Sequence, residues 1–243
     1  LGDSVSFYKI GLELLSGGAY FEVLDELARR GKKIFADLKF HDVPATVASA
    51  VRGLAQRPIT FATVHCDSRA MLEAAVTAKG PLQLLAVTVL TSNDASDLAA
   101  LGIAGNPADV VIERARLAQI AGIDGVVCSG ADLPRLRHAL GRDLLTVCPG
   151  IRPAGPSGDD QKRTVDVPTA FAQGAEVHFH DIGEQRCAEF AMRRGEHSAD
   201  WPREAVHGAE AGVGEGHSAE ETRSGHVRAR FFVCSILDGF SER

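Results

Sequence analysis

The sequence predicts an α/β fold in which parallel strands alternate with helices, either as a (β/α) barrel or as an open doubly wound sheet. Short apolar segments recur with a period of roughly 20–30 residues, and a segment of helical periodicity follows most of them. The length of 243 residues suits one barrel, or one and a half smaller domains. No Gly-x-Gly-x-x-Gly follows the early strands, which argues against a dinucleotide-binding sheet.

The expected elements follow in chain order. Strands are expected at residues 5–10, 34–39, 61–66, 82–90, 125–129 and 144–148. Helices are expected at residues 19–30, 106–121 and 133–140, with a further helix from Pro44 to before Pro58 and another capped by Asp67 or Ser68. Pro44 and the pair Asn106-Pro107 suit the first turn of a helix, where a missing N–H costs nothing.

Composition and charge exclude several classes of function. The net charge of -6 and the lack of a basic block argue against a nucleic-acid partner. No apolar run approaches the roughly 20 residues that cross a membrane, so no membrane partner is expected. The five cysteines show no Cys-x-x-Cys spacing, which is typical of reduced thiols in a cytoplasmic protein and not of a disulfide or zinc framework. They are Cys66, Cys128, Cys148, Cys187 and Cys234.

Residues 34–46 join a buried strand to a cluster of charges. Alternate strand residues share a face, so Asp37 and Lys39 are expected side by side, with Asp42 just past the strand end. Buried charges need partners and rarely add net stability even when they have them. Asp-x-Lys therefore indicates either a structural salt bridge at the sheet rim or a catalytic charge cluster.

In both candidate folds, chemistry takes place at the C-terminal ends of the strands. A single polar residue there, such as His65, is typical of an ordinary rim residue, but polar residues at successive strand ends indicate a site. These residues are Lys9, Asp37, Lys39, His65, Thr91, Ser129 and Arg152. Beyond Cys148, residues 149–163 supply glycines, Arg152 and Gln161, which suit either a phosphate monoester or a solvated surface loop.

The motif Asp37-x-Lys39-x-x-Asp42 followed by residues 43–46 resembles the catalytic strand of the orotidine 5′-phosphate decarboxylase family. Residues 63–65, 85–92 and 149–153 resemble further motifs of that family, and they occur in the family's order. The resemblance implies a (β/α)8 TIM barrel that is incomplete, with the first strand and helix missing or replaced. It also implies a homodimeric lyase with a shared active site, which decarboxylates orotidine 5′-monophosphate to UMP in pyrimidine biosynthesis without metal or cofactor.

The resemblance also implies a role for each matching residue. Lys39 would donate the proton to C6, Asp37 would lie near the departing carboxylate, and Asp42 would reach into the partner's site. The other matching residues would bind substrate: Lys9 at the ribose, Thr46 beside Asp42, His65 at the rim, Thr91 at the pyrimidine, and Arg152, Gln161 and Gly183 toward the phosphate.

The sequence departs from the family at both ends. No counterpart of the family's first strand is found before Leu1, and Glu184 follows Gly183 where the family has a phosphate-binding arginine. We expect residues 1–194 to form a partial barrel domain and residues 195–243 an atypical, disordered tail with a candidate strand at 230–237. That strand, followed by Asp238, could fill the first-strand position and bring Asp238 to the ribose, although we favour chance similarity.

Two alternatives to the orotidylate enzyme stay open. The Asp-x-Lys-x-x-Asp strand also occurs in magnesium-dependent sugar-phosphate enzymes such as 3-keto-gulonate-6-phosphate decarboxylase and hexulose-phosphate synthase. Residues 43–46 and the Gly-Ile-Arg-Pro loop favour the orotidylate enzyme over these. The second alternative is a catalytically impaired remnant of the orotidylate enzyme, which the departures at both ends of the sequence suggest.

Overall fold

The computed structural model describes residues 6–149, 173, 175, 177–181 and 232–236. Within these residues, eight strands form a closed barrel in which each strand pairs with the next along the chain. The strands are β1 (Phe7–Gly11), β2 (Lys33–Phe40), β3 (Phe61–His65), β4 (Gln83–Val87), β5 (Gly125–Val127), β6 (Leu145–Cys148), β7 (Val177–Asp181) and β8 (Phe232–Ile236). The helices are α1 (Leu12–Ser16), α2 (Tyr20–Arg29), α3 (Pro44–Ala55), α4 (Arg69–Ala78), α5 (Ala95–Ala100), α6 (Pro107–Ala121) and α7 (Leu133–Leu140).

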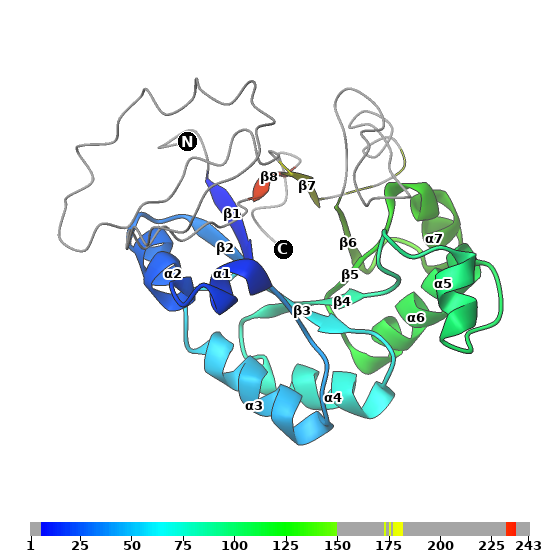
Figure 1. The fold of residues 1–243 in the computed structure, drawn as a ribbon, viewed down its shortest axis with the longest axis horizontal. Coiled ribbons are helices and arrows are strands. Elements are labelled where there is room, and N and C mark those ends of the chain that lie inside the picture. The colour runs from blue at the N-terminus through cyan, green and yellow to red at the C-terminus, as the bar shows by residue number, and fades with distance from the viewer. Residues whose placement is uncertain (1–5, 150–172, 174, 176, 182–231, 237–243) are drawn as a thin grey trace, which may run out of the picture.

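The predicted alternation of parallel strands and helices is confirmed, and the arrangement is a barrel and not an open sheet. Strands β1 to β7 run parallel, and Figure 1 shows the helices on the outside of the ring of strands. Helices α1 and α5 were not expected. Strand β4 ends at Val87 and not at Leu90, and β5 likewise ends early, at Val127.

The predicted helix starts form as the sequence indicates. The Ser68 hydroxyl accepts a hydrogen bond from the Met71 N–H at 3.4 Å and caps α4. The Asn106 side chain accepts one from the Ala108 N–H at 2.9 Å, just ahead of Pro107. These caps satisfy N–H groups that have no partner within the helix, and they fix where each helix begins.

The core has two parts, which lie on opposite faces of the strands. The larger part lies between strands and helices, and alternate strand residues such as Ile34, Ala36 and Ala62 belong to it. The smaller part contains only strand residues, which fill the barrel interior: Phe7, Phe35, Phe61, Leu85, Leu145 and Val147. Because side chains alternate along a strand, the residue two positions beyond each interior residue also points inward, nearer the C-terminal rim.

Strand β8 comes from the C-terminal part of the chain and closes the barrel between β7 and β1. It runs antiparallel to both neighbours, with Val233 opposite Tyr8 and Phe232 opposite Lys9. Our preference for chance similarity at residues 230–237 was therefore wrong. Strand β8 begins beside Lys9 and runs away from it. Asp238, which was expected at the ribose, lies outside the described residues.

Two further observations bear on the environment of the chain. Cys66, Cys128 and Cys148 are buried free thiols. Among the helices that the structure describes, none is long and apolar enough to cross a membrane.

Candidate active site

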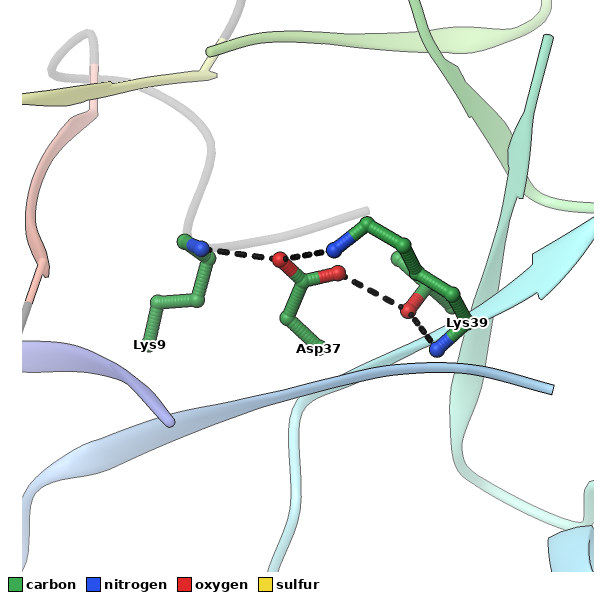
Figure 2. Close-up of polar contacts among 4 residues, drawn as sticks. Lys9, Asp37 and Lys39 are labelled. Carbon is green, nitrogen blue, oxygen red and sulfur yellow. Dashed lines mark hydrogen bonds and ion pairs between the residues drawn. The ribbon is translucent and has the colours of Figure 1, made fainter. Parts of the chain in front are cut away.

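Lys9, Asp37 and Lys39 form a chain of charges at the C-terminal ends of β1 and β2. Lys9 Nζ and Lys39 Nζ each lie 2.8 Å from Asp37 Oδ2, and they approach it from opposite sides (Figure 2). The exposed fractions of Lys9 and Asp37 are only 9% and 8%. The interior residues Phe7 and Phe35 lie two positions earlier on the same two strands, so an apolar layer lies beneath the charges.

The environment of Asp37 keeps its carboxylate ionised. Burial alone would raise the pKa of Asp37, but the ammonium groups of Lys9 and Lys39 and their hydrogen bonds outweigh burial and hold that pKa well below its usual range. Opposite charges within about 4–6 Å favour the charged form of a carboxyl group. The site therefore presents one fixed anion between two fixed cations.

The backbone of Lys39 is unusual for a strand residue. Its φ of 49° lies in the left-handed region, and no other described non-glycine residue has a positive φ. The left-handed conformation costs a residue with a Cβ roughly 1–2 kcal/mol, so the surrounding structure must hold it. The register between β2 and β3 shifts at this point, because Ala36 lies opposite Ala62 whereas Phe40 lies opposite Val64. Lys39 thus sits in a bulge that ends the regular pairing of these strands.

Thr63 of β3 lies at this bulge and is fully buried. Its hydroxyl oxygen accepts a hydrogen bond from the Lys39 N–H at 2.8 Å and lies 3.0 Å from Asp37 Oδ1, to which it donates. Thr63 was expected only as part of the motif at residues 63–65, without a role of its own. A signal was present, however: Phe7-x-Lys9, Phe35-x-Asp37 and Phe61-x-Thr63 each place an inward polar residue two positions after an interior phenylalanine.

His65 lies at the end of β3, two positions beyond Thr63. Its ring centroid is 5.3 Å from that of His41, whose Nε2 lies 3.1 Å from Asp67 Oδ2. Burial lowers the pKa of His65, and the nearby carboxylate of Asp67, which acts in the opposite direction, does not reverse this. His65 is therefore neutral at pH 7, so it offers both a hydrogen-bond donor and an acceptor at the rim.

The remaining predicted site residues do not join the charge chain within the described structure. Asp42 and Thr46 are exposed, and Asp42 Oδ1 accepts a hydrogen bond from the Val43 N–H at 2.6 Å. Thr91 is buried beyond the end of β4. Arg152, Gln161 and Gly183 lie outside the described residues.

The structure also bears on metal binding. Across the described ranges, no group of three or more His, Cys, Asp or Glu residues is placed to hold a metal ion. The chemistry that the arranged groups offer is electrostatic. Two ammonium groups beside a permanent carboxylate can stabilise negative charge that develops nearby, and an ammonium can supply a proton.

These features define the chain as a barrel protein of parallel βα units with a charged site at the C-terminal rim, which is the position of active sites in such barrels. Residues 1–178 match the Orotidine 5′-phosphate decarboxylase / HUMPS family. The chain belongs to this family.

Several relatives of the chain are named orotidine 5′-phosphate decarboxylase. The chain is 60% identical over 178 residues to an orotidine 5′-phosphate decarboxylase of Xanthomonas euvesicatoria pv. vesicatoria (strain 85-10). The aligned residues cover 73% of each chain. It is 58% identical over 178 residues to that of Stenotrophomonas maltophilia (strain K279a), covering 73% of this chain and 74% of the relative. A crystal structure of orotidine 5′-phosphate decarboxylase from Lactobacillus acidophilus superposes with a TM-score of 0.58 at 34% identity, covering 69% of this chain and 74% of that one.

Proposed function

We propose that the chain decarboxylates orotidine 5′-monophosphate to UMP in pyrimidine synthesis. The observation that carries this proposal is the Lys9–Asp37–Lys39 charge chain at the barrel rim, within the residues that match the family. The relatives at 58–60% identity are named orotidine 5′-phosphate decarboxylase, which supports this substrate over the sugar phosphates of the wider family.

The difficulty of the reaction is the unstable carbanion that forms at C6, because the proposed mechanism uses no cofactor that could accept its electron pair. The bond between C6 and the carboxylate breaks, CO2 leaves, and the electron pair stays on C6. The Lys39 ammonium stabilises this charge and then transfers a proton to C6, which forms UMP. The Lys39 side chain is partly exposed while its backbone is fixed, so it can reach a substrate at the rim.

Asp37 has two parts in this mechanism. It holds the Lys39 ammonium at 2.8 Å, and its fixed negative charge faces the substrate carboxylate before that group departs as neutral CO2. The repulsion is relieved as the carboxylate becomes CO2 in the transition state. Lys9, on the far side of Asp37, contacts the ribose.

The remaining roles follow the family pattern. His65 lies at the rim, Thr91 binds the pyrimidine edge, and Arg152, Gln161 and Gly183 bind toward the phosphate. Binding energy from the remote phosphate lowers the barrier only when it is used to order the site around C6.

We further propose a cytoplasmic homodimer with a shared active site. Asp42 and Thr46 are exposed at the start of α3, where they are free to enter a neighbouring subunit's site. The buried free thiols support a reducing environment.

The test is UMP formation from orotidine 5′-monophosphate by the purified full chain, with and without EDTA. We expect turnover that EDTA does not affect, and a loss of about a thousandfold in kcat for Lys39→Ala, since no other group takes over the proton transfer. Absence of UMP formation, with magnesium-dependent turnover of a sugar phosphate in its place, would instead favour a sugar-phosphate enzyme of the same family. A folded chain without turnover would identify the impaired remnant, in which Glu184 replaces the expected arginine.

A further inference from the structure

We infer that Thr63 is a positioning residue for the decarboxylation, which fixes Lys39 and Asp37 relative to each other through its hydroxyl. This inference rests on the proposed function for its kinetic consequence, and on the geometry of the bulge for its structural basis. Thr63 itself is 0% exposed, so it acts through Lys39 and Asp37 and does not touch the substrate.

The two hydrogen bonds of Thr63 have defined directions. Asp37 is ionised and can only accept, so the hydroxyl proton of Thr63 points to Asp37 Oδ1 at 3.0 Å. The hydroxyl oxygen then has its lone pairs free to accept the Lys39 N–H at 2.8 Å. One side chain therefore connects the carboxylate of the charge chain to the backbone of the residue that carries its second ammonium.

The bulge explains why this connection is needed. Between the pairs Ala36–Ala62 and Phe40–Val64, β2 contains three residues whereas β3 contains only Thr63. In a regular parallel ladder, strand N–H groups find carbonyl oxygens on the neighbour, and a bulge disrupts that pattern. The Thr63 hydroxyl replaces the missing acceptor for Lys39.

The left-handed backbone of Lys39 makes the position sensitive to this acceptor. A φ of 49° is unfavourable for lysine, and without the hydrogen bond the backbone can relax toward an ordinary strand conformation. Such a rotation changes the direction of the Lys39 side chain. A displacement of about 1 Å in a catalytic group can cost on the order of a hundredfold in rate, so a modest relaxation is enough to impair turnover.

Variants at position 63 separate the hydroxyl from the rest of the side chain. Thr63→Val keeps the shape and removes the hydroxyl, and Thr63→Ser keeps the hydroxyl and removes the methyl group. Thr63→Ala differs from Thr63→Ser by the hydroxyl oxygen alone, so the pair remains informative if valine prevents folding. Thr88→Val is the matched control, because Thr88 is also buried but donates its hydroxyl to the Val127 carbonyl at 2.8 Å.

We expect Thr63→Val and Thr63→Ala to lose about tenfold or more in kcat, with KM within about twofold of the original. Thr63→Ser should stay within about threefold of the original kcat, and Thr88→Val should leave it unchanged. Amide hydrogen exchange of Lys39, followed by NMR on the full chain, should accelerate in the valine and alanine variants and not in serine.

The kcat values and the Lys39 exchange rates each test whether the Thr63 hydroxyl is required. An unchanged kcat in Thr63→Val, or equal losses in Thr63→Ser and Thr63→Ala, overturns it, because the hydroxyl would then be dispensable. Unchanged Lys39 exchange in the valine and alanine variants also overturns it. If the original chain forms no UMP, the proposed function fails separately, and the exchange rates still test whether Thr63 holds Lys39.

Discussion

Lys9 and Lys39 come from different strands, yet their ammonium nitrogens lie 2.8 Å from the same oxygen atom, Oδ2 of Asp37. The shared oxygen makes Asp37 the element that allows two cations to lie close together in a largely buried site. Removal of either lysine leaves Asp37 with one cationic partner, whereas removal of Asp37 leaves two cations without an anion between them.

This relationship predicts how stability depends on pH. The folded pKa of Asp37 lies below the unfolded value of about 3.9, so at acidic pH the unfolded state binds more protons. The contribution of ionised Asp37 to the unfolding free energy is present above the unfolded pKa, and it is lost as pH falls toward the folded pKa. Lys9→Met removes one of the two cations and raises the pKa of Asp37, so the loss of unfolding free energy between pH 7 and pH 3 should be smaller.

Urea unfolding at the two pH values measures this difference, which is at most about 1.3 kcal/mol because pH 3 lies only about one unit below the unfolded pKa. Arg69→Met is the control, since it breaks an exposed pair with Glu73 that contributes little. An equal acid response in Lys9→Met and the original chain would show that Lys9 does not stabilise the ionised form of Asp37.

Mixed dimers test whether Asp42 acts across the subunit interface. Lys39→Ala and Asp42→Ala subunits should each be inactive alone. After subunit exchange at equal concentration, half of the dimers are mixed and each has one intact site, so about a quarter of the original activity should return. Absence of recovery after verified exchange would assign Asp42 to the site of its own chain.

The buried hydroxyl of Tyr20 is a site where a substitution should stabilise the protein. Its side chain is buried, and within the described residues its hydroxyl has no hydrogen-bond partner. Burial, with a smaller contribution from the charge of Asp37, raises the pKa of Tyr20, so the hydroxyl stays protonated. Tyr20→Phe removes an unsatisfied polar group and should raise the unfolding free energy by about 1 kcal/mol.

Tyr20→Leu serves as the control, because it also removes the ring that meets Phe21 edge-on at 5.3 Å, and it should destabilise. Chemical denaturation of both variants gives the comparison. A loss of stability in Tyr20→Phe would mean that the hydroxyl has a partner in solution.

Because β8 pairs with both β1 and β7, we expect this C-terminal segment to stabilise the barrel. Deleting residues 227–243 exposes the edges of β1 and β7, so the melting temperature should fall and the protein should aggregate more readily. Val233→Pro keeps the chain length but removes a backbone N–H from a strand that has neighbours on both sides, so it should also lower the melting temperature. Thermal melts that match the original chain in both variants would exclude β8 from the folded barrel.

Local signals in the sequence predict most of the βα units. Strand β3 was expected from its apolar run, and α4 and α6 were expected from the caps at Ser68 and Asn106. Helix α5 was missed although its signal was present: Asp94 and Asp97 form a reciprocal capping box. The helix has only six residues, fewer than two turns, so its apolar periodicity is too short to recognise.

The rest depended on contacts between distant segments. Nothing local predicts a left-handed backbone at Lys39, because lysine has no preference for it and its acceptor, Thr63, lies on the next strand. The apolar pattern of residues 230–237 indicates a strand but carries no information about its direction, which depends on the partners at Tyr8 and His180.

Because Tyr8 pairs with Val233, the barrel cannot close on the ribosome until synthesis has passed residue 233. Lys9, Asp37 and Thr63, in contrast, come from the first three parallel strands, whose pairing requires only short stretches of nascent chain. Contacts close in sequence form faster than contacts between distant segments, and folding proceeds from the N-terminus during synthesis. We therefore expect the charge chain to assemble while the barrel is still open, and the docking of β8 to be the slow, final step of folding.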